Sequence, residues 1–299
     1  MGRAARQLKL EGVFAAAVTP NRPGTLDIDY PALLDLLDFL TAGGVDGICL
    51  MGSTGEFLKF SFSDRQRLIY LAAKRSRVPL MVGVGHTTLT GALQLAGDAI
   101  AAGADALLLM PPPFFRYGQP EIEEFYCEFA RETGDAVPLL LYNIPQFTSA
   151  LELGTVRRLL DAGLFAGIKD SGGDWDYFAG LLAHRREKPF ALLAGNDRVA
   201  LRALQEGADG MVSGCACAAP ELVSGLYKAV AGGDGALAGR LNDRLQEFCG
   251  WIERFPTPVA IKRAVELRGQ KGGELSVPLA AETAAEMGRF SEWFKGMKL

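Results

Sequence analysis

The stretch AGGVDGICL at residues 42–50 recurs in altered form as AAGADALLL at 101–109 and as QEGADGMVS at 205–213. In each copy a glycine follows a helical pattern, a short turn carries an aspartate, and an apolar run begins. LDAGLFAGIK at 160–169 is a looser fourth copy. Glycine is favoured where a helix ends, and short apolar runs bounded by turn residues are typical of buried parallel strands. The repeat therefore predicts alternating helices and strands.

Apolar runs that read as strands occur eight times in the chain. They lie at 13–19, 47–51, 80–85, 106–110, 139–143, 166–169, 191–194 and 210–213. Helical spacing fills the intervals, for example at 30–40, where leucines fall on one face. Ser63 with Gln66 matches a capping box that would open another helix.

Eight strands that alternate with helices predict an α/β fold of the (β/α)8 TIM barrel type. A doubly wound open sheet is the structural alternative. The turn after the first run, TPNRPG at 19–24, lacks the GxGxxG pattern of such sheets, and no Walker A motif occurs in the sequence. We expect a barrel catalytic domain over 1–220, with the eighth helix following it. Residues 221–299 lack strand signals and predict a C-terminal helical extension packed on the barrel.

Composition narrows the class of partner. The 299 residues are 49% hydrophobic, which is enough to bury a large core and excludes a disordered chain. Lys and Arg number 31 against 35 Asp and Glu, so no surplus of positive charge exists to neutralise phosphates. We expect no nucleic-acid partner.

The cysteines predict a reduced, cytoplasmic protein. They are five in number and irregularly spaced, which does not fit a secreted disulfide framework. With two histidines in the chain, no set of metal ligands has a recognisable spacing, so no metal site is expected. No apolar run is long enough to span a bilayer, and the first residues, MGRAARQLKLEG, have no apolar leader region.

In TIM barrels the active site lies where the strands end at their carboxyl side. Lys169 ends the apolar run 166–169, where an unpaired ammonium is costly. Burial favours the neutral amine of a lysine, and a neutral amine can form a Schiff base with a carbonyl compound. The structural alternative is an ion pair between Lys169 and Asp170. Tyr142 ends the preceding run and is expected beside Lys169, either as a proton relay or as an aromatic filling the barrel top.

The turn GSTGE at 52–56 sets two hydroxyl residues between two glycines. Successive backbone N–H groups in such a turn can bind a small carboxylate. An ordinary glycine-rich turn has the same composition, and Glu56 would then cap or fix it.

Three ordered motifs, GSTGE at 52–56, YNIP at 142–145 and GIKDSGGD at 167–174, resemble those of a known family. These are the class I, Schiff-base-forming pyruvate aldolases typified by dihydrodipicolinate synthase and N-acetylneuraminate lyase. The resemblance runs from Phe14 to about Phe255. It implies a (β/α)8 barrel with a C-terminal helical extension, a homotetramer built as a dimer of dimers, and no cofactor.

By this resemblance Lys169 is the Schiff-base lysine and Tyr142 the proton-relaying phenol. Ser53 and Thr54 would hold the pyruvate carboxylate and extend the relay. Val212 matches a position that lines the pyruvate pocket.

Other positions of the resemblance bear on the second substrate. Gly195 and Asp197 match the loop that contacts substrate hydroxyls in the sugar-acid lyases. Phe147 stands where the lysine-pathway synthases carry an arginine that recognises a substrate carboxylate. Phe114 and Phe115 replace a tyrosine pair, one of whose hydroxyls comes from the neighbouring subunit in those synthases to complete the relay.

A carboxylate-bearing substrate would then need another cation. Arg116, Arg198 or His86 could provide it, although each also fits an exposed loop residue.

The function expected is that of a pyruvate-dependent lyase, an aldolase or a dehydratase. Its partners would be pyruvate and a small aldehyde or 2-oxo acid, for example 4-hydroxy-2-oxoglutarate, whose aldolase branch GIKDSGGD resembles, or a 2-keto-3-deoxy sugar acid. One alternative is a 4-hydroxy-tetrahydrodipicolinate synthase, which condenses pyruvate with aspartate semialdehyde. A non-catalytic pyruvate-binding barrel is another. A phosphate-binding barrel isomerase is disfavoured because GND at 195–197 and SGCAC at 213–217 make poor phosphate sites.

Overall fold

The apolar runs of the sequence form a closed barrel in the computed structural model, which describes residues 8–25 and 27–297. Eight parallel strands of the described chain pair in chain order, and the first closes the ring by pairing with the last. The strands are β1 Gly12–Ala16, β2 Gly47–Leu50, β3 Leu80–Gly83, β4 Ala106–Leu109, β5 Leu139–Asn143, β6 Gly167–Asp170, β7 Ala191–Ala194 and β8 Gly210–Ser213. The predicted (β/α)8 fold is confirmed.

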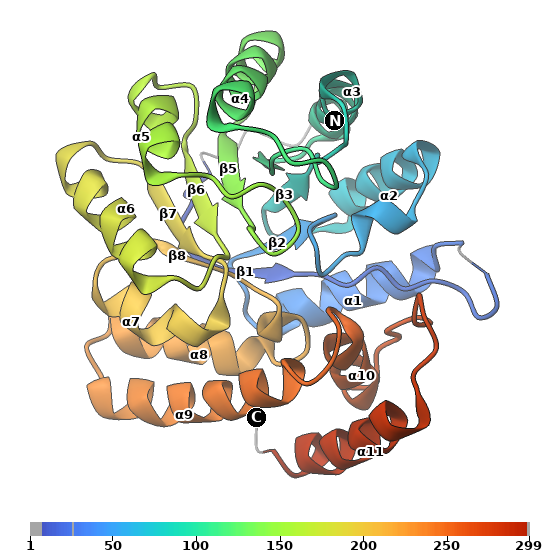
Figure 1. Cartoon of the computed structure of the whole chain (residues 1–299). Coiled ribbons are helices and arrows are strands. Elements are labelled where there is room, and N and C mark those ends of the chain that lie inside the picture. Colours follow the sequence, from blue (N-terminus) through green and yellow to red (C-terminus); the bar gives the residue numbers. More distant parts are fainter. Residues whose placement is uncertain (1–7, 26, 298–299) are drawn as a thin grey trace.

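Helices form a ring around the strands (Figure 1). They are α1 Tyr30–Ala42, α2 Phe62–Arg75, α3 Leu89–Ala102, α4 Gln119–Thr133, α5 Leu153–Asp161, α6 Trp175–Glu187, α7 Ala200–Gln205 and α8 Pro220–Ala231. Short 3-10 turns follow three of the strands, namely η1 Phe57–Lys59, η2 Asp197–Val199 and η3 Cys215–Cys217. Residues 1–7, on which the expectation of no leader rests, lie outside the described residues.

The repeated aspartate has a structural role at the start of the even strands. Asp46, before β2, accepts a hydrogen bond at 2.8 Å from the backbone N–H of Val13 in β1. Asp105 does the same for Leu80, the first residue of β3, and Asp209 for Leu192, the second residue of β7, also at 2.8 Å. The aspartate side chain thus accepts a hydrogen bond from a backbone N–H that has no partner in the strand ladder. We call these three contacts the aspartate pins.

The looser fourth copy of the repeat lacks such a pin. Ala166 stands where the other copies have the aspartate. Its backbone N–H donates to the carbonyl of Leu139, just as the backbone N–H of each aspartate donates to a carbonyl of the preceding strand. Alanine has no acceptor to offer. The strand pair β5–β6 is instead joined by side chains at its opposite end, where Asn143 donates to Asp170 at 2.7 Å.

Two local predictions were wrong by a few residues. The first strand ends at Ala16, earlier than the predicted 19, because the chain leaves the ladder while still buried in the barrel. Helix α2 is capped by Ser61, whose hydroxyl accepts from the N–H of Asp64 at 3.2 Å. Ser63 lies inside the first turn and its hydroxyl meets that of Ser61, so it caps nothing.

Beyond α8, the chain forms α9 Gly235–Ile252, α10 Val259–Leu267 and α11 Ala281–Gly296. Helix α9 lies along α8, and α10 and α11 follow around the same side of the barrel (Figure 1). Aromatic rings of α9 and α11 pack together, with Phe248 at 5.2 Å from Phe294 and Trp251 at 5.9 Å from Trp293 between ring centroids. In the described part of the chain no helix could cross a membrane.

Candidate active site

Lys169 and Tyr142 face each other across neighbouring strands. They are register partners in the β5–β6 pair, and both side chains are buried, with 3% and 1% exposed. The Nζ of Lys169 lies 4.0 Å from the centroid of the Tyr142 ring. A cation or an amine over the ring face is held by the ring electrons without a counter-ion.

The alternative ion pair between Lys169 and Asp170 does not form. Successive residues of a strand point to opposite faces, so the Asp170 carboxyl leaves the barrel axis. There its Oδ1 accepts from Asn143 at 2.7 Å and from the N–H of Gly172 at 3.2 Å. Burial raises the pKa of Asp170 to about 6.

The turn at 52–56 carries Ser53 to the same place. Its hydroxyl lies 3.2 Å from the phenolic oxygen of Tyr142, and Thr54 beside it is buried. The turn is tight, with Gly55 donating to the carbonyl of Gly52 at 3.1 Å and Glu56 in a left-handed conformation at φ 50°. The hydroxyls of Ser53 and Tyr142 therefore form a pair, and the ring of Tyr142 lies against the amine of Lys169.

Glu56 fixes this turn through the C-terminal extension. Its Oε2 accepts from Lys262 of α10 at 2.8 Å, and its Oε1 accepts from Ser276 at 2.6 Å. Lys262 is 1% exposed and donates a second bond to the carbonyl of Glu274 at 2.6 Å. The pairing links residues 206 positions apart, which no local pattern could predict.

The residues to which the resemblance gives a catalytic or substrate-binding place line one pocket at the carboxyl ends of the strands. It has a volume of about 380 Å³, and these residues are Ser53, Thr54, Tyr142, Phe147, Lys169, Gly195, Asp197 and Val212. Their individual roles remain predictions.

Gly195 and Asp197 shape the side of the pocket that follows β7. A Cβ at Gly195 would lie 2.7 Å from Cε of Lys169 and 2.1 Å from Oγ of Ser171, so only glycine lets this loop approach the lysine. Asp197 is half-buried, and its carboxylate accepts from the hydroxyl of Ser213 and from the N–H of Cys215. Desolvation raises the pKa of Asp197.

Sequence reasoning missed several lining residues. Thr257, Ile252 and Cys249 come from the helical extension, and Ile144 follows the tyrosine of the YNIP motif. Ile144 could have been found from the sequence, because it is part of the YNIP motif. The extension residues lie far along the chain from any motif, so nothing in the sequence pointed to them.

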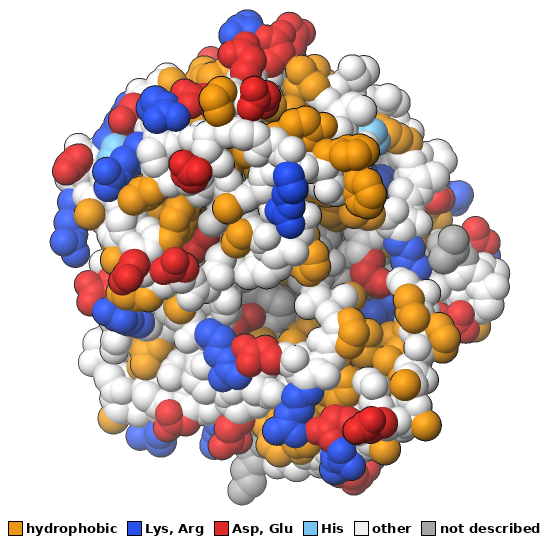
Figure 2. Space-filling model, in the orientation of Figure 1, with side chains coloured by type: hydrophobic (Ala, Val, Ile, Leu, Met, Phe, Trp, Pro, Cys, Tyr) orange, Lys and Arg blue, Asp and Glu red, His pale blue; other side chains and the backbone are white. Residues whose placement is uncertain are grey.

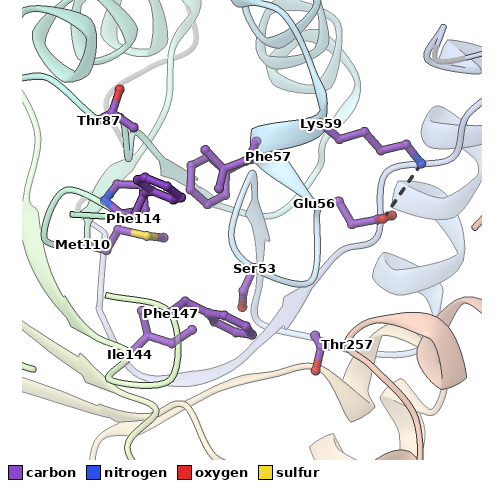
Figure 3. A pocket seen from close by; sticks show the side chains of 12 residues that line it. Ser53, Glu56, Phe57, Lys59, Thr87, Met110, Phe114, Ile144, Phe147 and Thr257 are labelled. Carbon is purple, nitrogen blue, oxygen red and sulfur yellow. Dashed lines mark ion pairs between the residues drawn. The ribbon is translucent and has the colours of Figure 1, made fainter. Parts of the chain in front are cut away.

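A second, larger hollow adjoins the lysine pocket. It has a volume of about 630 Å³, and its lining is drawn in Figure 3. It shares Ser53, Ile144, Phe147 and Thr257 with the lysine pocket. Hydrophobic side chains also gather on this face of the molecule, near the ends of α3 and α4 (Figure 2).

The three cationic candidates for a distal carboxylate are already engaged. Arg198 binds both oxygens of Glu253, at 2.7 and 2.6 Å. Arg116 donates to the carbonyl of Thr148. His86 bonds Thr88 through Nδ1 at 3.0 Å, and desolvation lowers its pKa, which favours the neutral ring.

A metal centre is not evident in the described ranges 8–25 and 27–297. No group of three or more His, Cys, Asp or Glu residues there is placed to share an ion. The expected absence of a metal stays a prediction.

Comparison with known proteins gives a consistent result. A family model described as "Dihydrodipicolinate synthetase family" matches residues 9–294. A 4-hydroxy-tetrahydrodipicolinate synthase from Neisseria gonorrhoeae is 34% identical over 279 residues, which cover 92% of this chain and 94% of that protein. One from Methanoculleus marisnigri is 30% identical over 273 residues, covering 90% of this chain and 93% of that protein.

Solved structures show the same architecture. A prophage protein of the dihydrodipicolinic acid synthase family from E. coli K12, in complex with pyruvate, superposes with a TM-score of 0.88 at 26% identity. The match covers 95% of this chain and 98% of that one. The 4-hydroxy-tetrahydrodipicolinate synthase of Methylacidiphilum fumariolicum SolV superposes with a TM-score of 0.87 at 29% identity, covering 96% and 97%.

Proposed function

The chain belongs to the dihydrodipicolinate synthetase family, and on that premise we propose that Lys169 forms a Schiff base with pyruvate. The protein is a lyase of the class I aldolase type. The observation that carries the proposal is the placement of the buried Lys169 amine over the ring of Tyr142, whose hydroxyl meets Ser53.

The chemistry begins at the pyruvate carbonyl. The neutral amine of Lys169 adds to C2 of pyruvate, and loss of water from the adduct leaves an imine. The imine draws electrons from the methyl carbon, which loses a proton to give an enamine. The enamine carbon then adds to an aldehyde, or the reverse steps release pyruvate from a longer 2-oxo acid.

Proton transfer is assigned to the hydroxyl pair. The Lys169 amine lies over the Tyr142 ring, and the hydroxyl of that ring exchanges protons with Ser53 over 3.2 Å. Such a relay supports the formation and loss of water at C2. Ser53 and Thr54, with the N–H groups of their turn, bind the pyruvate carboxylate. Val212 closes the pocket beside them.

The second reactant is proposed to be an aldehyde or, in the direction of cleavage, a longer 2-oxo acid. Candidates are 4-hydroxy-2-oxoglutarate and 2-keto-3-deoxy sugar acids, the latter with Gly195 and Asp197 facing their hydroxyls. Condensation with aspartate semialdehyde is the second candidate, favoured by the names of the relatives. Against it, Phe147 offers no charge to a carboxylate, so the charge-assisted contact that an arginine would make there is absent.

We place the enzyme in the cytoplasm as a homotetramer, a dimer of dimers. Support for the association comes from the exposed Phe114 and Phe115, which stand on the loop after β4 with 83% and 61% exposed. Exposed aromatic pairs of this kind mark interaction surfaces. The helical extension over 221–299 is proposed to be part of the barrel's fold and not a separate domain.

Reduction with borohydride in the presence of pyruvate tests the Schiff base. The intact mass should rise by one reduced pyruvate adduct, and peptide mapping should place it on Lys169. The Lys169→Ala protein, shown to be folded by circular dichroism, is the control. Full trapping by that variant would refute the assignment.

A further inference from the structure

We propose that Asn143 and Asp170 are positioning residues for the Schiff-base chemistry of Lys169. A hydrogen bond of 2.7 Å between their side chains joins the ends of β5 and β6 behind the lysine pocket. Neither is among the described residues that line this pocket. The inference rests on the proposed function, because turnover that depends on Lys169 is its readout. It goes further by naming two residues that act on the site without touching it.

The pair stands one residue beyond the tyrosine and the lysine. Asn143 and Asp170 are register partners of β5 and β6, directly after the partners Tyr142 and Lys169. Successive residues of a strand point to opposite faces, so the two pairs lie on opposite sides of one short ladder. Asn143 and Asp170 are 3% and 2% exposed. Whatever fixes the outer pair therefore also fixes the backbone from which the inner pair extends.

Both ends of the Asn143 amide are used. Its Nδ2 donates to Oδ1 of Asp170, and its Oδ1 accepts from the N–H of Leu151 at 3.1 Å. Turning the amide over would place its oxygen against the carboxylate and its NH2 group against an N–H donor. Oδ1 of Asp170 also accepts from the N–H of Gly172 at 3.2 Å. The two side chains thus tie both strand ends to the loops that follow them.

These loops form part of the pocket wall. Ile144 and Phe147 lie between Asn143 and Leu151, and both line the lysine pocket, as does Ser171 after β6. The backbone N–H of Ser171 donates to the carbonyl of Asn143 at 2.9 Å. Loss of the outer hydrogen bond would therefore loosen the wall together with the strand that carries the lysine.

The main chain of Asp170 extends the connection to the loop after β7. Its carbonyl accepts from the N–H of Gly195 at 2.7 Å. The loop of Gly195 passes so close to Lys169 that a Cβ there would lie 2.7 Å from the lysine Cε. The position of Asp170 therefore also sets how closely this loop approaches the lysine.

Small displacements at this level matter for the reaction. Addition of the amine to C2 of pyruvate needs the reacting atoms within about 3–3.5 Å, and a misplacement of about 1 Å can cost about 10²-fold in rate. The pyruvate carboxylate is assigned to Ser53 and Thr54, which follow β2, a strand that pairs with β1 and β3. Loosening the pair on β5 and β6 should therefore lower kcat and leave KM for pyruvate nearly unchanged.

Deuterium exchange at the pyruvate methyl group gives a readout that needs no second substrate. The imine on Lys169 loses a methyl proton to give the enamine, which takes up a deuteron from D2O. NMR follows the decay of the methyl signal, and its rate against pyruvate concentration gives kcat and KM for exchange. Trapping with borohydride is measured on the same samples.

Asn143→Asp removes the donor and sets a second carboxylate against Asp170. At pH 8 we expect kcat for exchange to fall by about 10²-fold. Two carboxylates this close share a proton as the pH falls, so the loss should shrink to less than about tenfold at pH 5.5, relative to the unmodified protein. Asp174, which caps α6, and Tyr177 in the first turn of α6 also act on Asp170, and every variant keeps them.

Exchanging the two residues separates the hydrogen bond from the side chains that make it. In Asn143→Asp/Asp170→Asn the amide and the carboxylate trade places, so one again donates to the other. The carboxylate on β5 still accepts from Leu151. We expect this double variant to regain at least about tenfold of the rate lost at pH 8. Asp170→Asn alone keeps an oxygen for the Asn143 donor and should stay within about threefold of the parent rate.

Two further variants complete the set, with folding checked by circular dichroism. Asn242→Asp makes the same chemical change on α9 and keeps the oxygen that accepts from Gln246 at 3.2 Å, so kcat and its pH dependence should not change. Asp170→Leu adds no charge and offers the Asn143 amide no acceptor. It should lower kcat by about tenfold, and it serves as the main test if Asn143→Asp does not fold.

The outcomes distinguish the two proposals. Without exchange or trapping by the unmodified protein, the proposed function itself fails. With both intact, a folded Asn143→Asp or Asp170→Leu protein that keeps the parent kcat overturns the inference. A double variant no faster than Asn143→Asp also overturns it, as does a loss confined to KM for pyruvate.

Discussion

The hydroxyl of Tyr142 can be removed without disturbing the barrel, because the ring keeps its place over Lys169. Tyr142→Phe should lower kcat by about 10²–10⁴-fold, the usual contribution of a positioned proton donor. Steady-state rates of pyruvate release measure this, with the midpoint of thermal unfolding recorded alongside. A fully active variant would rule out the relay, and measured turnover in the parent protein that Tyr142→Phe abolishes would exclude a non-catalytic barrel.

Asp170 makes stability depend on pH. Its pKa of about 6 in the fold lies above the ordinary aspartate value of 3.8, so the folded chain holds this proton more tightly than the unfolded chain does. The stabilisation is present below about pH 4 and is lost as the pH rises through 6. Relative to Asp170→Asn, the unmodified protein should lose on the order of 2–3 kcal/mol of unfolding free energy between these limits.

Urea unfolding of both proteins from pH 4 to 8 gives the comparison. Asparagine retains an oxygen to accept from Asn143 and Gly172, so the variant should fold. Asp135→Asn, at an exposed carboxyl, is the matched control. Parallel curves for Asp170→Asn and the unmodified protein would show that the buried carboxyl does not titrate in this way.

At the scale of elements, the pairing of Glu56 with Lys262 joins the turn at 52–56 to α10. Lys262→Met leaves the largely buried Glu56 without the cation that lies 2.8 Å from its Oε2, and breaking such a pair costs about 3–5 kcal/mol. A turn held less firmly should also raise KM for pyruvate more than it lowers kcat. Denaturant unfolding and steady-state kinetics measure the two effects.

An exposed pair supplies the comparison. Arg289→Met removes the contact with Glu286 on the surface of α11 and should change stability by less than about 1 kcal/mol. Equal losses in the two variants would mean that Lys262 acts like any surface lysine. An unchanged KM for pyruvate in Lys262→Met would show that the contact with α10 does not affect the function of the turn.

Much of the fold was predictable because every barrel strand is buried on both faces. Such strands read as short apolar runs, and the repeat around Asp46 and Asp105 marks where they start. Their ends were less certain, since the residues after Ala16 stay buried beyond the last ladder bond. The cap of α2 was misplaced because Ser61 and Ser63 carry the same side chain, and only the backbone conformation decides between them.

The candidate site was predictable where it depends on strand ends. Lys169 and Tyr142 end consecutive runs, so parallel order alone brings them together. Contacts that span the chain, such as that of Glu56 with Lys262, leave no periodic signal, and neither does the place of Thr257 in the pocket lining. The ion pair between Arg198 and Glu253 could not be predicted for the same reason. The sequence of a loop does not show whether an arginine in it is paired.

At the scale of the whole molecule, barrel and extension should unfold together. The three tryptophans divide between them, with Trp175 in α6 and Trp251 and Trp293 in α9 and α11. Fluorescence of Trp175→Phe then reports on the extension, and that of a Trp251→Phe/Trp293→Phe variant on the barrel. Each should share its midpoint with the circular dichroism signal of the same variant.

Each comparison is made within one variant, so changes in stability caused by the substitutions cancel. A fluorescence transition that precedes the loss of helical signal in Trp175→Phe would mark the extension as a separate domain. Coincident transitions would place residues 221–299 in the cooperative unit of the barrel.

Each aspartate pin joins two strands that follow one another in the sequence, namely β1 with β2, β3 with β4, and β7 with β8. Those of Asp46 and Asp105 lie wholly before α4, and that of Asp209 lies wholly after it. A gene interrupted in the exposed turn around Asp135 would therefore encode two halves that each keep their own pins. Lys169 and Tyr142 would both be in the second half and Ser53 in the first. Catalysis would then report reassembly of the halves, which makes this turn the natural junction for a split enzyme.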